Sequence, residues 1–237
     1  GGDLMPYIDK RVNILPEKKE YSVYACPIFD SIKKGNIKVF YGRLKGKLLA
    51  KSYIKKNNIT GMEGIGIEYS HKYTVNYLPE INSDVKYDLA VSFISPHYIV
   101  AKKVNAKAKI AWIHTDYSKI AVDRESEVKM WDAYDKVISI SDSVTRAFLQ
   151  SFPSLRDKMY LIEHIIPEVF INEQAETGKN DAEKEMKKRT DELILLSVGR
   201  FCYAKNFENI PEMCKYIRNK GINIRWYIIG FGPDEVL

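Results

Sequence analysis

The sequence predicts an α/β protein built from two successive domains, and three observations lead to this prediction. Short apolar runs rich in β-branched residues alternate with helical segments, which is typical of a parallel sheet with helices on both faces. A polar, charged stretch at residues 172–191 interrupts this alternation, which then starts again. The 237 residues and the hydrophobic fraction of 45% are sufficient for packed cores.

The first domain is expected to contain four strands separated by helices. The expected strands are residues 87–93, 109–113, 136–140 and 159–162, and the helices between them are residues 98–105, 124–134 and a third that ends before Pro153. Ser141 or Asp142 is expected to cap that third helix, because either side chain can accept a hydrogen bond from its first turn. Two further strands, less regular in pattern, are expected at residues 11–15 and 21–27.

The second domain is expected to begin with one strand–helix–strand unit. Its elements are residues 193–198, 207–220 and 224–229. The predicted division is a first domain at residues 1–168, a linker at 169–191 that is helical around 182–188, and the start of the second domain at 192–237. One such unit cannot cover both faces of its own strands, so we expect the second domain to be incomplete in this chain.

A basic stretch from Lys33 to Lys56 carries nine lysine or arginine residues, and residues 31–62 contain no carboxylate. Such a stretch can bind phosphates in nucleic acid, in a lipid headgroup or on a sugar carrier, or it can be a solvated helix face. An apolar stripe recurs within it at helical spacing, and its members are Ile37, Tyr41, Leu44 and Leu48. Such a stripe can face the core or a membrane surface, and we expect this one to face the core.

We expect the basic stretch to hold the first domain peripherally on anionic membranes. A lysine or arginine near such a surface contributes about 1 kcal/mol of attraction, which weakens as salt rises. If they are exposed, the apolar side chains of Phe40, Leu49 and Tyr53 are expected to insert beside the cations.

Two neighbouring strands of the second domain end in motifs suited to binding a diphosphate. The first strand is followed by Gly199 and Arg200, with Lys205 just ahead of the next helix, and the second is followed by Gly230 and Gly232. Ligands of open α/β sheets bind beyond the carboxyl ends of the strands. Two cations there can neutralise charge on a departing phosphate. Taken singly, each motif also fits a surface loop or a tight turn.

Together the two motifs resemble those of the retaining glycosyltransferases of family 4, which have the GT-B architecture of two Rossmann-like, doubly wound domains. The match covers residues 193–233, and weaker similarity to bacterial capsule or exopolysaccharide enzymes extends back to residue 87. This similarity includes His114 after one expected strand and Ser141 after the next. His164 stands where the family usually has an asparagine.

The resemblance implies transfer of a sugar, with retention, from a UDP-sugar or another nucleotide sugar to a saccharide acceptor that is expected to be lipid-linked. His114, Arg200 and Lys205 are implied to act in catalysis, with His114 and Arg200 on opposite walls of a cleft between the domains. The residues implied to bind the donor are Gly199, Arg200, Lys205, Gly230 and Gly232. This chemistry implies neither a protein nucleophile nor a metal or other cofactor.

Two family features are not found where the family has them. The sequence lacks the glycine-rich loop that follows the first strand, and the Glu-x7-Glu motif that contacts the donor does not follow Gly232; that spacing occurs only at Glu168 and Glu176, ahead of the second domain. We expect the first upstream of Gly1 and the second beyond Leu237. The parent protein is therefore expected to be an enzyme of surface polysaccharide synthesis, and this chain alone to be inactive or nearly so.

Rival interpretations make different demands on the sequence. A nucleotide-sugar epimerase or dehydrogenase would need Gly-x-Gly-x-x-Gly and an acidic residue downstream, and neither occurs. A non-enzymatic module that binds anionic membrane or nucleic acid through the basic stretch stays open, as does a catalytically dead transferase; we expect no nucleic-acid partner. The three cysteines without paired spacing favour a cytoplasmic location, at the inner face of the plasma membrane if the chain is peripheral.

Overall fold

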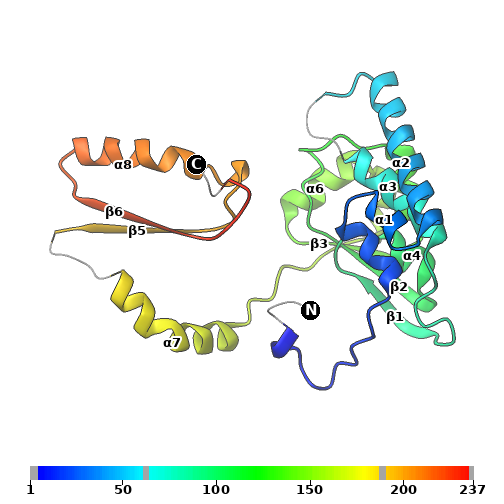
Figure 1. The fold of residues 1–237 in the computed structure, drawn as a ribbon, viewed down its shortest axis with the longest axis horizontal. Coiled ribbons are helices and arrows are strands. Elements are labelled where there is room, and N and C mark those ends of the chain that lie inside the picture. The colour runs from blue at the N-terminus through cyan, green and yellow to red at the C-terminus, as the bar shows by residue number, and fades with distance from the viewer. Residues whose placement is uncertain (1–4, 61–63, 187–190, 235–237) are drawn as a thin grey trace. The chain divides into compact units, whose positions relative to one another are not determined.

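The computed structural model describes residues 5–60, 64–186 and 191–234 of the chain. The chain divides into two compact units, unit 1 (Gly1–His164) and unit 2 (Ile165–Leu237). Each unit has a parallel sheet of its own, with four strands in unit 1 and two in unit 2 (Figure 1).

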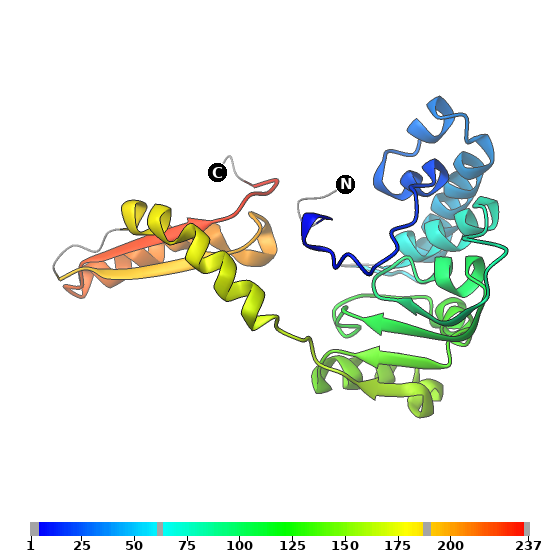
Figure 2. The same ribbon diagram turned by 90° about the horizontal axis from the view of Figure 1, so that it is seen from below.

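Unit 1 is built on four parallel strands in the spatial order β1-β2-β3-β4, which Figure 2 shows running side by side. The strands are β1 (Tyr87–Ser92), β2 (Ala106–Ile113), β3 (Lys136–Ser139) and β4 (Met159–Leu161). They are connected by α4 (Tyr98–Lys103), α5 (Arg124–Trp131), α6 (Asp142–Ser151) and the 3-10 helix η4 (Pro153–Lys158). All four expected strands are confirmed, and the cap of α6 is Ser141, whose Oγ accepts a hydrogen bond from the Val144 amide.

The connecting helices of unit 1 cover one face of its sheet. The strand order rises steadily, so each crossover steps to the next strand in the same direction. Right-handed crossovers that all step in one direction place their helices on the same side of the sheet. The core takes Ala111 and Val137 from that face and Trp131 from α5. On the other face Leu89 and Val91 of β1 are exposed. Unit 1 is thus a parallel α/β unit of Rossmann-like type, and the second layer of helices that we expected is not seen among the described residues.

The segment that precedes the sheet contains helices and irregular chain. Its elements are η1 (Met5–Tyr7), η2 (Lys19–Ala25), α1 (Asp30–Lys33), α2 (Ile37–Lys56), α3 (Ile65–Thr74) and η3 (Val75–Tyr77). The strands expected at residues 11–15 and 21–27 are therefore wrong. In the second of these, Tyr21 donates a hydrogen bond to the Pro79 carbonyl (2.6 Å) and packs with Tyr24 against α2. Aromatic residues are common in strands, so the composition of a helical turn rich in tyrosine predicts a strand.

Helix α2 packs against α3 through its smallest residues. The residues buried on that face are Val39, Gly42, Gly46 and Ala50. A Cβ atom on Gly46 would lie 2.6 Å from the Tyr69 carbonyl oxygen, so the missing side chain allows the two backbones to approach. The stripe of Ile37, Tyr41, Leu44 and Leu48 is exposed instead, and the expectation that it faces the core is wrong.

Unit 2 starts with α7 (Glu168–Glu185) and continues as a strand–helix–strand unit. Its elements are β5 (Leu193–Val198), η5 (Tyr203–Lys205), η6 (Phe207–Asn209), α8 (Ile210–Asn219) and β6 (Ile224–Ile229). The two strands have the bounds that the sequence predicts, and they pair in parallel from Leu193 opposite Ile224 to Val198 opposite Ile229. Helix α7 occupies most of the stretch that we expected to be a linker. The helix begins at Glu168, well before the helical part that we expected at residues 182–188.

The contact between α2 and α3 can be tested with Gly46→Ala. An exposed glycine in a helix gains about 1 kcal/mol of stability on replacement by alanine. At Gly46 the new methyl group would press on backbone atoms of α3, and overpacking of this kind costs roughly 1–3 kcal/mol. We expect Gly46→Ala to lower the free energy of unfolding in urea, whereas Ser52→Ala on the exposed side of α2 leaves it unchanged or slightly higher. Equal stability of the two variants would contradict the close contact.

Candidate functional site

The two motif loops of unit 2 lie side by side at the carboxyl ends of β5 and β6. The Gly199 amide donates to the Ile229 carbonyl at 3.0 Å, so strand pairing continues beyond β5. A Cβ atom on Gly230 would lie 1.8 Å from the Gly199 carbonyl oxygen, and one on Gly232 would lie 2.1 Å from the Phe201 carbonyl oxygen. Both positions therefore require glycine for the loops to meet.

Arg200 and Lys205 project from this pair of loops, and both are exposed. The Lys205 side chain folds back so that its Cδ and Cε lie 3.5 Å from the position of a Cβ atom on Gly199. Asn206 takes a left-handed conformation (φ 55°), which separates η5 from η6. Neither cation forms an ion pair with a residue that the structure describes. Two such cations beside a glycine turn are a suitable site for a phosphate group.

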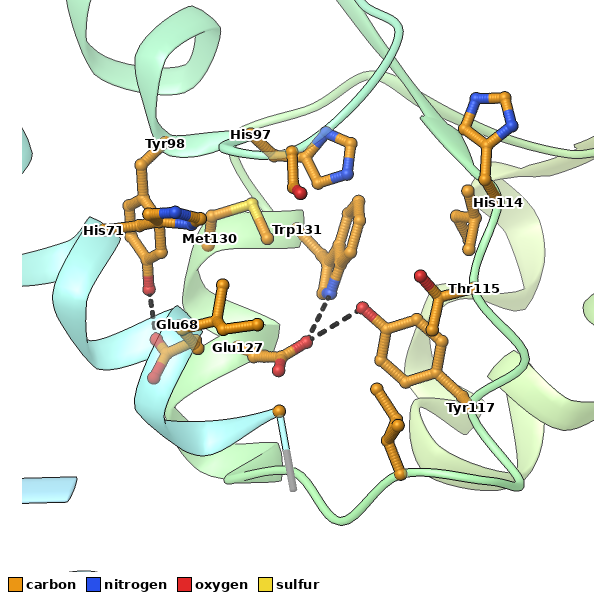
Figure 3. A pocket seen from close by; sticks show the side chains of 15 residues that line it. Glu68, His71, His97, Tyr98, His114, Thr115, Tyr117, Glu127, Met130 and Trp131 are labelled. Atoms are coloured by element: carbon orange, nitrogen blue, oxygen red, sulfur yellow. Dashed lines mark hydrogen bonds between the residues drawn. The ribbon is translucent and has the colours of Figure 1, made fainter. Parts of the chain in front are cut away.

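Unit 1 contains a cavity of about 240 Å³ at the carboxyl end of β2 (Figure 3). Its walls come from α3, α5, the start of α4 and the loop that follows β2. The ionisable and aromatic side chains that matter for its chemistry are Glu68, His71, His97, His114, Glu127 and Trp131.

Glu68 is a buried carboxyl group in the wall of this cavity. The side chain belongs to a residue that is 7% exposed, and its Oε1 accepts hydrogen bonds from the Tyr98 hydroxyl (2.5 Å) and the Ser126 hydroxyl (2.7 Å). Its Oε2 has no hydrogen-bond partner among the described residues. Burial raises the pKa of Glu68, although the hydrogen bonds from Tyr98 and Ser126 oppose the rise. Leaving a buried oxygen without a hydrogen-bond partner costs free energy.

Glu127 is the second buried carboxyl group of the cavity. Its Oε2 accepts hydrogen bonds from the Tyr117 hydroxyl (3.1 Å) and more weakly from the Trp131 indole (3.4 Å), as Figure 3 shows. Burial, together with the nearby charge of Glu68, raises the pKa of Glu127 to about 7. Near neutral pH this group therefore exists in both protonation states and can donate or accept a hydrogen bond.

Three histidines form a further polar part of the cavity wall. Burial lowers the pKa of both His71 and His97 to about 4, so both rings are neutral at pH 7. The Nε2 of His114 lies 2.7 Å from the Phe93 carbonyl oxygen. Because a carbonyl only accepts, Nε2 carries a proton in this contact. The His164 ring stacks on His114 with centroids 5.1 Å apart.

The structure brings the predicted site residues together in two groups. Unit 2 unites the glycines and cations of the two motifs, and unit 1 places His114 in the wall of the cavity. Sequence reasoning missed Glu68 and Glu127, as well as the buried rings of His71 and His97. No spacing links these residues, because they come from separate elements and only their shared burial makes them a site.

No protein-family model matches the sequence, and no curated protein matches it either. Within the described residues, no group of three or more histidine, cysteine, aspartate or glutamate side chains is placed to hold a metal ion. Evidence on function therefore comes from the chemistry of the two sites.

The raised pKa of Glu127 predicts a pH-dependent stability. Because the folded protein holds this proton more tightly than the unfolded chain, the contribution is complete below the ordinary pKa of 4.5 and is lost as the pH rises through about 7. We expect the free energy of unfolding, relative to Glu127→Gln, to fall by on the order of 3 kcal/mol between about pH 5 and about pH 8. Urea unfolding at several pH values measures it.

The wild type must be compared with Glu127→Gln because the titration of His71 and His97 changes the stability in the opposite direction. Their lowered pKa values make the protein less stable as the pH falls from about 6.5 toward 4, and this effect is present in both proteins. Glu125→Gln, on the exposed side of the same helix, serves as the matched control. Parallel pH profiles for the wild type and Glu127→Gln would show that Glu127 titrates normally.

Proposed function

We propose that this chain is part of a retaining glycosyltransferase of GT-B type, which transfers a sugar from a UDP-sugar or another nucleotide sugar to a saccharide acceptor. The observation that carries the proposal is the contact between two loops at neighbouring strand ends. Gly230 and Gly232 meet the loop that starts at Gly199, and this loop presents Arg200 and Lys205. Such a meeting of glycine turns and cations at the carboxyl ends of parallel strands suits a nucleotide diphosphate.

The chemistry follows from charge and position. The planar guanidinium of Arg200 can bind two phosphate oxygens at once, and Lys205 adds a second positive charge. As the bond between the sugar carbon and the phosphate oxygen breaks, negative charge grows on the diphosphate, and both cations stabilise it. The acceptor hydroxyl forms the new bond on the face that the diphosphate leaves, and its proton passes to the departing phosphate.

We propose that the cavity of unit 1 binds the saccharide acceptor. Glu127 can donate or accept a hydrogen bond with a sugar hydroxyl near neutral pH. His114 lies at the wall of the same cavity. We propose that its side chain contacts the donor sugar. A lipid-linked saccharide in surface polysaccharide synthesis is the acceptor class that we propose.

The donor site is tested by Arg200→Ala and Lys205→Ala. Each loses a charge-assisted contact with phosphate, so each is expected to weaken UDP binding at least about tenfold in calorimetric titration. In a transfer assay of the complete enzyme, each is expected to raise the barrier by about 2–4 kcal/mol, measured as kcat/KM.

Lys215→Ala is the matched control, because Lys215 is an exposed cation of unit 2 on α8. It is expected to bind UDP as the wild type does. Wild-type affinity in Arg200→Ala and Lys205→Ala, or an equal loss in all three variants, would contradict the proposed donor site.

A further inference from the structure

The outward side of α2 carries an apolar stripe in place of a polar face. Its members are Ile37 (68% exposed), Tyr41 (55%), Leu44 (38%) and Leu48 (59%). At 3.6 residues per turn they lie opposite Gly42 and Gly46, which face α3. A surface helix of a globular protein normally directs such a stripe to the core, whereas α2 directs it to the solvent.

Lysines border this stripe on both of its long sides. The helical repeat places Lys47 and Lys51 along one side and Lys38 and Lys45 along the other, and all four are exposed. Helix α2 contains no aspartate or glutamate that could neutralise them. An apolar strip with cations on both flanks is the pattern of a helix that lies in a membrane interface.

The same pattern continues from α2 into α1. Phe29 and Ile32 are exposed, and the Phe29 ring lies 5.8 Å from the ring of Phe40. Lys33 and Lys34 follow directly and are exposed as well. The apolar and basic surface therefore extends beyond one helix.

We propose that this surface, the docking face formed by the apolar stripe of α2, its flanking lysines and Phe29, binds an anionic lipid bilayer. The stripe enters the boundary between headgroups and acyl chains, and the lysines meet the headgroup phosphates. A second copy of the chain would set lysine rows against lysine rows. Nucleic acid would pair with the lysines and leave the stripe in water. Of these three occupants, the anionic lipid surface alone matches both parts of the face.

The residues that insert differ from those expected from the sequence. Phe40 and Tyr53 are half-buried against neighbouring elements, so they do not meet the condition of exposure, and Leu49 is exposed but lies off the stripe. None of the helices in the described ranges has the length and apolar character that spanning a bilayer requires. The proposed attachment is to the surface of the membrane. It does not depend on the proposed function, although a lipid-linked acceptor would give it a use.

The test is co-sedimentation of the chain with phosphatidylcholine vesicles that contain or lack phosphatidylglycerol, at low and high salt. We expect binding to the anionic vesicles alone, and weaker binding as salt rises. A lysine near an anionic surface is worth about a factor of five in binding, so joint replacement of Lys45, Lys47 and Lys51 by Glu should weaken partitioning at least about 100-fold. Joint replacement of Leu44 and Leu48 by Ser should weaken it at low salt as well.

The matched control replaces Lys86, Lys119 and Lys129, exposed lysines on other parts of unit 1, by Glu. Both triple variants change the formal net charge from +6 to 0, so the control removes the same charge from a different place. It should retain most of the binding. Thermal unfolding checks that each variant is folded, and UDP affinity should be unchanged in all of them, which separates this proposal from the donor site.

Four outcomes would overturn the proposal. They are no binding to anionic vesicles at low salt, an equal loss in the two triple variants, unchanged binding in the double Ser variant, and a lipid-free dimer that the double Ser variant dissociates. The third outcome, with competition by DNA, would assign the lysines to nucleic acid. The fourth would assign the stripe to a second copy of the chain.

Discussion

Close approach of two backbones, made possible by glycine, is the constraint on which both units depend. In unit 2, Gly230 and Gly232 let the loops at the ends of β5 and β6 touch, and this contact fixes where Arg200 and Lys205 project. In unit 1, Gly46 lets α2 rest directly on α3. That contact turns the larger apolar side chains of α2 outward, so the same physical cause underlies the proposed donor site and the proposed docking face.

Burial has a different role in the cavity of unit 1. Placing Glu68 and Glu127 among aromatic side chains raises the pKa of both carboxyl groups, and the same environment keeps His71 and His97 neutral. Hydrogen bonds from Tyr98 and Ser126 hold one oxygen of Glu68 and leave the other without a partner among the described residues. The two histidine rings are therefore uncharged at pH 7, and Glu127 is only partly ionised there.

The sequence predicted those parts of the fold that short-range patterns determine. Apolar runs located the six strands of the described residues, and a pair of capping residue types, Ser141 and Asp142, located the start of α6. The apolar pattern gave the wrong buried face for α2. This helix has large apolar residues on one side and small residues on the other, and spacing alone does not tell which side a partner helix will contact. The carboxylates of the cavity were also missed, because Glu68 and Glu127 meet only through tertiary packing.

The most direct test of the central claim, a diphosphate site at the ends of β5 and β6, is an amide NMR titration of the chain with UDP. The account predicts shifts at residues 199–206 and 230–232, with the amides of α2 unchanged. Absence of shifts in these two loops, or shifts confined to the basic surface of α2, would contradict it.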